Sequence, residues 1–166
     1  MLDARSPLVD VQFPTINGVS LSEAPDFTLT QVAGNDKDFK RALGKFPAKI
    51  GVALDHDART LLRVGPKQIW VLGAAPEEHA GCYTTPLSSG RTRIALSGVD
   101  VRDVLASCAA IDFHAAEFKP SHFVMTGIHH TPVLIHCIGE NEFHIYTLRT
   151  FALAVWEWLE DAAKGI

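Results

Sequence analysis

The chain of 166 residues is long enough for one domain, or for two small halves that share a core. Apolar residues make up 47% and charged residues 20%, as in an ordinary globular protein, and the net charge of −4 gives no basic surface for nucleic acid or an anionic membrane. Three widely spaced cysteines, no secretory leader pattern and no apolar run of about 20 residues predict reduced thiols in a cytoplasmic protein.

The first 25 residues are polar and are interrupted by three prolines, so we predict an N-terminal arm at 1–25 that docks on the rest or frays. We expect 26–166 to form a single domain. Within it, residues 26–80 have the order strand, helix, three strands, helix. The strands are predicted at 26–32, 49–54, 59–64 and 68–72, and the helices after a cap at Asn35 or Asp36 and at 76–79.

Residues 91–164 repeat that order with clearer patterns. A strand at 91–96 precedes a capping-box spacing at 97–100, which predicts the start of a helix. Three apolar runs follow, at 122–128, 132–138 and 143–148, and a helix at 151–164 closes the segment. The sequence therefore predicts an α+β fold of two βαβββα-type (ferredoxin-like) halves, 26–80 and 91–164, each an antiparallel sheet with its helices packed on one face.

The eight histidines suggest a metal site, but their spacing does not support one. No HxxxH, HExxH or CxxC pattern occurs. A four-residue loop at 139–142 would pair Ile138 with Phe143 and His136 with Ile145. That register places His136 and His144 on opposite faces of the sheet, so we expect no metal ligands.

Patterns for nucleophilic or nucleotide chemistry are equally weak. Cys137 and His136 are neighbours along one strand and face apart, so Cys137 is better interpreted as a core thiol. No GxSxG elbow, GxGxxG loop or GxxxxGK loop is present. We therefore predict no catalytic residue and no cofactor-binding residue in this chain.

The closing helix has an unusually wide apolar surface. One stripe, consisting of Ala152, Val155, Trp156, Leu159 and Ala163, is predicted to pack on the sheet. A second apolar flank contains Phe151, Ala154, Trp158 and Ala162. Either the arm or the first half covers this flank, or a partner protein does, because aromatic residues concentrate at interfaces. Phe151 and Trp158 are the candidate partner interface.

A string of short motifs runs through residues 87–164. They are Arg-Thr-Arg-Ile-Ala-Leu-Ser-Gly at 91–98, Val-Arg-Asp-Val-Leu at 101–105, Ile-Asp-Phe-His at 111–114, Phe-Lys-Pro at 118–120, Thr-Pro-Val-Leu-Ile at 131–135, Phe-His-Ile-Tyr at 143–146 and Thr-Phe-Ala-Leu-Ala-Val-Trp-Glu-Trp-Leu-Glu-Asp-Ala-Ala at 150–163. With these motifs, residues 87–164 resemble the gamma subunit of heterotetrameric sarcosine oxidase, a relative of the folate-binding domain of aminomethyltransferases. Gly-Pro-Lys-Gln-Ile-Trp-Val-Leu at 65–72 is similar to a tryptophan-centred strand of the same family.

The resemblance implies a non-catalytic subunit, which takes part in enzymatic turnover only within an oxidoreductase complex. Such complexes demethylate sarcosine, or a related N-methyl amine, to glycine and transfer the one-carbon unit to tetrahydrofolate. The resemblance also implies that FAD, FMN, NAD, zinc and tetrahydrofolate are held mainly by the other subunits. The expected partners are alpha, beta and delta subunits, chiefly the large alpha subunit.

Two alternatives remain open at this point: a free-standing tetrahydrofolate-binding or aminomethyltransferase-like protein, and a generic protein-interaction module. The folate-binding relatives carry an acidic residue in the second strand of the central hairpin, near 130–135 here. This chain has His-Thr-Pro-Val-Leu-Ile and no carboxylate at those positions. The difference argues against an independent transferase.

Overall fold

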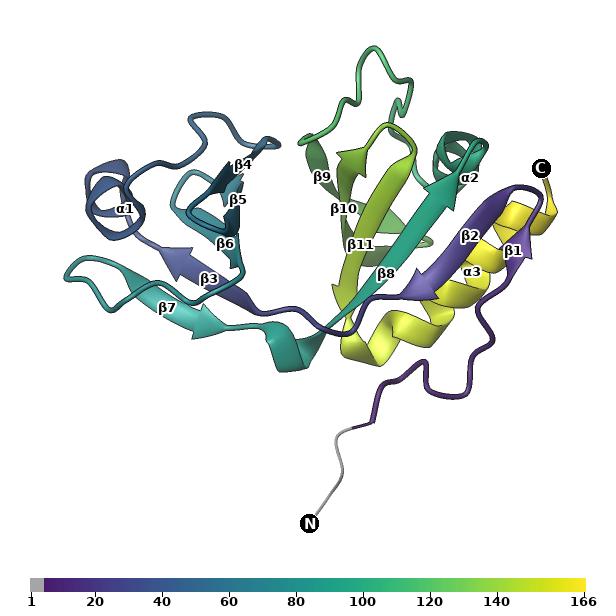
Figure 1. The fold of residues 1–166 in the computed structure, drawn as a ribbon, viewed down its shortest axis with the longest axis horizontal. Helices are drawn as coiled ribbons and strands as arrows, with labels where there is room; N and C mark the ends of the chain where they lie inside the picture. The colour runs from purple at the N-terminus through teal and green to yellow at the C-terminus, as the bar shows by residue number, and fades with distance from the viewer. Residues whose placement is uncertain (1–4) are drawn as a thin grey trace. The chain divides into compact units, whose positions relative to one another are not determined.

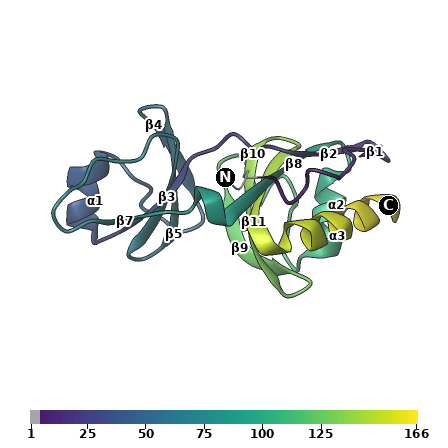
Figure 2. The same ribbon diagram turned by 90° about the horizontal axis from the view of Figure 1, so that it is seen from below.

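A computed structural model describes residues 5–166 as two compact units. Asp26–Ser89 form one of them, which we call the middle unit. The first 25 residues join Gly90–Ile166 in the other, which we call the C-terminal unit. Figure 1 shows the elements of both units and Figure 2 shows them from below.

The middle unit is a five-stranded antiparallel sheet with one helix. Its elements are β3 (Leu29–Ala33), α1 (Asp36–Leu43), β4 (Ala53–His56), β5 (Arg59–Gly65), β6 (Gln68–Leu72) and β7 (Tyr83–Pro86), and the strand order is β4-β5-β6-β3-β7. Asn35 caps α1 by accepting a hydrogen bond from the backbone N–H of Asp38. Phe39 and Leu43 of α1 pack into a core cluster with residues of β3, β5 and β6.

The C-terminal unit is a six-stranded antiparallel sheet with two helices. Its elements are β1 (Thr15–Ile16), β2 (Val19–Glu23), β8 (Arg91–Gly98), α2 (Val101–Cys108), β9 (Phe123–Ile128), β10 (Thr131–Gly139), β11 (Glu142–Leu148) and α3 (Ala152–Lys164), and the strand order is β1-β2-β8-β11-β10-β9. Short 3₁₀ turns at Ser88–Gly90 and Arg149–Phe151 precede β8 and α3.

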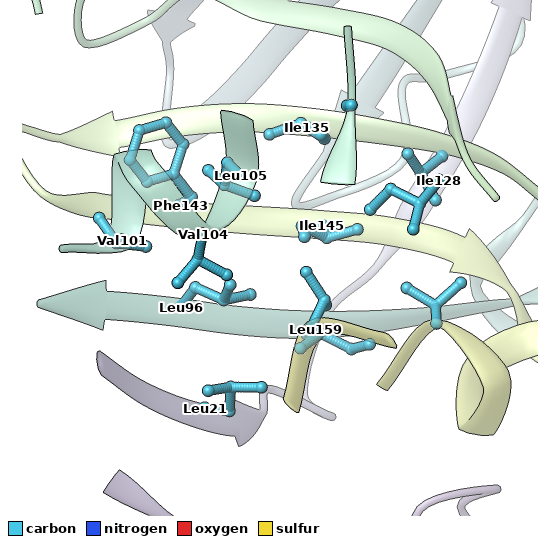
Figure 3. Packing of buried hydrophobic residues seen from close by; sticks show 14 of the residues in the cluster. Leu21, Leu96, Val101, Val104, Leu105, Ile128, Ile135, Phe143, Ile145 and Leu159 are labelled. Carbon is cyan, nitrogen blue, oxygen red and sulfur yellow. The ribbon is translucent and has the colours of Figure 1, made fainter. Parts of the chain in front are cut away.

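One face of this sheet forms the main core with α2 and α3. Leu96, Ile135, Phe143 and Ile145 extend from three strands toward the helices, where they pack with residues such as Leu159, as Figure 3 shows. The alternation of buried residues along β8, Thr92, Ile94 and Leu96, follows from the two-residue period of a strand.

The predicted duplication is present in the topology. Each unit runs strand, helix, three strands, and the order β4-β5-β6-β3 in the middle unit matches β9-β10-β11-β8 in the C-terminal unit. The α+β fold class with antiparallel sheets is therefore confirmed. The helix predicted at 76–79 does not form, and β7 closes the middle unit instead. The four residues from Pro76 to His79 are too few to offset the cost of helix nucleation.

The segment predicted as an N-terminal arm packs on the C-terminal unit, which is the docked form of the two that the sequence left open. Val19 and Leu21 of β2 are buried in its core, and β2 pairs with β8 along its full length. Leu8 is also fully buried, and the Ser6 hydroxyl donates to the carboxylate of Glu23. The sequence did not predict β2, because five residues are too few for an alternating pattern to be clear. The prolines at 7, 14 and 25 also favoured an irregular segment. Residues 1–4 of the predicted arm lie outside the described residues.

None of the helices in the described chain is long and apolar enough to cross a membrane.

Candidate functional site

The closing helix α3 has the core stripe that its sequence predicts. Its buried residues are Ala152, Val155, Trp156, Leu159 and Ala163. Trp156 is almost fully buried, and Phe13 approaches its ring edge-on with 5.4 Å between centroids. The segment before β1 therefore covers the Trp156 side of the helix, and Figure 2 shows this segment running beside α3.

The second flank of α3 is covered in part by a hairpin turn. Trp158 is half-buried at the edge of the core cluster, and the ring of His129 lies 4.7 Å from its ring, centroid to centroid. His129 and His130 form the two-residue turn between β9 and β10 with φ of 44° and 69°. Such φ values suit a type I′ hairpin turn but cost a non-glycine residue energy. The turn thus holds an imidazole on the indole at some cost in backbone strain.

The apolar side chains at the start of α3 are exposed to solvent. Phe151 stands at the N-cap position with 44% of its surface exposed, and Leu153 is 46% exposed. The structure thus places Phe151 and Trp158 at the predicted flank, one exposed and one half-buried. The prediction omitted Leu153, which the helical wheel assigns to the polar side, and His129, which only the hairpin fold brings to the helix.

The two central histidines share one face of the sheet, so the predicted opposite-face arrangement is wrong. His136 lies directly opposite His144 in the β10–β11 ladder. The predicted register holds at the loop, where Gly139 pairs with Glu142, but it shifts between Cys137 and Gly139. Ile138 is the extra residue of a β-bulge, and one extra residue reverses the face of every residue beyond it.

The surroundings of these histidines are polar and partly positive. Burial, followed by the charges of Arg93 and His136, lowers the pKa of His144 to about 4. Burial raises the pKa of the neighbouring Tyr146, against the opposing effect of Arg93. His144 is therefore neutral at pH 7. Within residues 5–166 no three His, Cys, Asp or Glu side chains are grouped so that they could hold a metal ion.

Cys137 is a core thiol, as its position predicts. It is fully buried, it donates to the carbonyl of Gly139, and its burial raises the pKa of the thiol. A protonated, inaccessible thiol is a poor nucleophile. Its neighbour Arg102 has a structural role: the guanidinium donates to the carbonyls of Phe113, Phe118 and Glu140.

A hollow of about 570 Å³ in the middle unit also brings reactive residue types together. It is lined by Glu78, His79, Cys82 and Tyr83, among others. Burial and the charge of Asp38 raise the pKa of Cys82, so this thiol is also protonated at pH 7. The hollow contains no activated nucleophile among these residues.

Comparison with known proteins is consistent with this geometry. The paired βαβββ topology has the fold of two solved structures. Heterotetrameric sarcosine oxidase from Corynebacterium sp. U-96, in complex with pyrrole 2-carboxylate, contains a chain that matches with a TM-score of 0.84 and 22% identity, covering 97% of this chain and 95% of that one. Glycine cleavage system aminomethyltransferase T from Bartonella henselae matches with a TM-score of 0.66 and 17% identity, over 95% of this chain and 57% of that one.

This chain therefore has the fold that these two proteins share. A family model described as "Sarcosine oxidase, gamma subunit family" matches residues 71–165, which is more than half of the chain. The chain belongs to the sarcosine oxidase gamma subunit family. A search of curated protein sequences gives no match.

Proposed function

We propose that this chain is the gamma-type, non-catalytic subunit of a sarcosine-oxidase-like complex. The observation that carries the proposal is the apolar flank of α3, which presents exposed Phe151 and half-buried Trp158 two helical turns apart, in a chain of this family. A few residues, often aromatic, contribute most of the binding energy of a protein interface. The role of such a subunit is to bind the other subunits of the complex.

The complex that we propose oxidatively demethylates sarcosine, or a related N-methyl amine, to glycine and passes the one-carbon unit to tetrahydrofolate. We place its FAD, FMN, NAD, zinc and folate in the other subunits. The state of three side chains supports placing the cofactors in the other subunits. The thiols of Cys82 and Cys137 are protonated near pH 7 and are therefore not activated nucleophiles. His144 is neutral at that pH and is therefore not a charged general acid.

We further propose that alpha, beta and delta subunits are the partners, that the large alpha subunit covers most of the α3 flank, and that the assembly is cytoplasmic. The net charge of −4 supports contact with protein surfaces over contact with nucleic acid. Oxidase activity then belongs to the complex and depends on this chain being bound.

A free-standing tetrahydrofolate-binding protein is the second candidate, because the fold of aminomethyltransferase T matches most of this chain. The absence of a carboxylate in the sequence at 130–135 argues against it. Titration of the purified chain with tetrahydrofolate distinguishes the two functions. We expect no saturable binding, and micromolar binding would favour the second candidate.

The test of assembly is co-expression of the tagged chain with the other three subunits from its host. We expect all three to be recovered with the wild-type chain. Phe151→Ser should weaken recovery, since a hot-spot aromatic contributes at least about 2 kcal/mol to binding. Tyr83→Ser is the matched control, because Tyr83 is a 77% exposed aromatic residue in the middle unit. Equal recovery with both variants would remove the α3 flank from the interface.

A further inference from the structure

The edge of the six-stranded sheet at β9 is open. β9 pairs with β10 on one side, and no strand in the described part of the chain pairs with its other side. Figure 1 shows β9 as the outermost strand of this sheet. Its six residues, Phe-Val-Met-Thr-Gly-Ile, include no charge and no proline, and their register against β10 is regular. Met125 in its centre is 54% exposed.

The backbone groups that point outward follow from the ladder. A two-residue turn makes Ile128 and Thr131 a hydrogen-bonded pair, and such pairs alternate along an antiparallel ladder. The Cys137 N–H donates to the His122 carbonyl, which agrees with this alternation at the far end. The N–H and C=O groups of Phe123, Met125 and Gly127 therefore face the open edge, about 7 Å apart.

The other edges of the two sheets have the features by which proteins block unwanted strand pairing. β1 has two residues, and β7 has four and ends in Pro86. β4 is the topological equivalent of β9 in the middle unit, and it carries Asp55 and His56. Of these four edges, β9 is the one that is long, uncharged and free of proline.

We propose that the open edge of β9 binds an extended segment of a partner subunit, which adds a seventh strand to this six-stranded sheet. Three donors and three acceptors at two-residue spacing are complementary to an extended backbone. The incoming segment carries apolar side chains on the side of Val124 and Ile128, because both of these residues pack with the core under the helices. The inference rests on the proposed function, since it requires a hetero-complex.

Hydrogen exchange of single amides tests this pairing. In the isolated chain the amides of Phe123, Met125 and Gly127 should exchange fast, whereas those of Val124 and Thr126 are protected by β10. In the co-expressed complex the three outward amides should exchange at least about tenfold more slowly, which a new ladder hydrogen bond produces.

Met125→Pro provides a second readout, because proline removes an outward N–H without breaking a bond to β10. We expect little change in the melting temperature of the isolated chain. The dissociation constant for the other subunits should be at least about tenfold higher, because the variant loses one backbone hydrogen bond and its proline ring blocks the edge. Met125→Ala keeps the N–H and should assemble normally. Thr84→Pro, the same change at an outward position of β7, is the control for proline itself.

Each outcome has one meaning. A complex that forms while the three outward amides remain unprotected overturns the inference and leaves the proposed function intact. A wild-type chain that does not assemble with the other subunits contradicts both. Protection in the isolated chain, accompanied by a dimer that Met125→Pro dissociates, would identify a second copy as the occupant and would also overturn the inference.

Discussion

Trp156 and Trp158 are two positions apart on α3 and point in directions that differ by about 200°. Trp156 is enclosed by the sheet and by Phe13, whereas Trp158 is half-buried against His129. The helical wheel alone distinguishes the two side chains, and so the core role of Trp156 could be predicted from sequence. The imidazole on Trp158 could not, because it comes from a turn that is distant in sequence.

We therefore expect the two tryptophans to differ in their effect on stability. Trp156→Ala should lower the free energy of unfolding by about 3–5 kcal/mol, the usual cost of emptying a buried aromatic site. Trp158→Ala should lower it by only about 1 kcal/mol, because this side chain is only partly buried. Denaturant unfolding of both variants measures the difference. Equal losses would show that the second flank of α3 is as enclosed as the first.

His144 should make stability depend on pH. Its pKa is about 4 in the folded chain and 6.5 in the unfolded chain, so the unfolded chain binds the extra proton between these values. The contribution is fully present above pH 6.5 and is lost as pH falls toward about 4. We expect a loss of about 1–2 kcal/mol, reduced from full linkage because the side chain is partly exposed.

The variant His144→Gln isolates this effect. Unfolding measured from pH 7.5 to 4 should show a flatter profile for His144→Gln than for wild type. His130→Gln, the same substitution at an exposed turn, is the matched control. An unchanged slope in His144→Gln would mean that another group dominates the acid response.

At the scale of elements, the equivalent hairpins β5–β6 and β10–β11 share one irregularity. Each has a register shift two residues before its turn, between Arg63 and Gly65 and between Cys137 and Gly139. Both read as an apolar residue, Gly, two turn residues and Gln or Glu. Periodicity cannot detect a single bulged residue, which is why the predicted faces of His136 and His144 were wrong. Comparison of the two hairpin sequences, which share this pattern, was the only available indication of the bulge.

The same turns are held by arginines from different elements. Arg63 on β5 donates to the carbonyls of Pro47, Ala48 and Pro66. Arg102 on α2 donates to the carbonyl of Glu140, at the turn position equivalent to Pro66, and to two carbonyls of the loop that follows its own helix. In both units a guanidinium donates hydrogen bonds to loop carbonyls, but the arginine that provides it lies on a strand in one unit and on a helix in the other. The topology of the repeat was therefore predictable from sequence, whereas the side chains that bind its loops were not.

Asn17 should stabilise the end of α3. Its side-chain amide donates to the carbonyls of Ala163 and Ile166, and its φ is 47°. Asn17→Gly suits that φ and removes only the two hydrogen bonds, so we expect a loss of about 1 kcal/mol. Asn17→Ala also strains the turn and should lose about 2 kcal/mol. Thermal unfolding compares them, and an Asn17→Gly variant as stable as wild type would show that the cap contributes nothing.

At the scale of the whole molecule, the chain is two copies of one βαβββ topology with an N-terminal segment paired to the second copy. Element order in the sequence was sufficient to predict the repeat. It was not sufficient to predict that β2 joins β8, because strand pairing between residues 19–23 and 94–98 is non-local and has no local signature. The family assignment rests on residues 71–165, within which the apolar flank of α3 lies.

We propose that this chain acts as a bound subunit and performs no oxidation by itself. The most direct measurement is size-exclusion chromatography of the co-expressed complex, in which each fraction is assayed for this chain, for flavin absorbance and for sarcosine-dependent oxygen consumption. We expect all three to elute together and the chain purified alone to be colourless and inactive. Flavin or sarcosine turnover in the isolated chain, or full activity in fractions that lack it, would refute the proposed function.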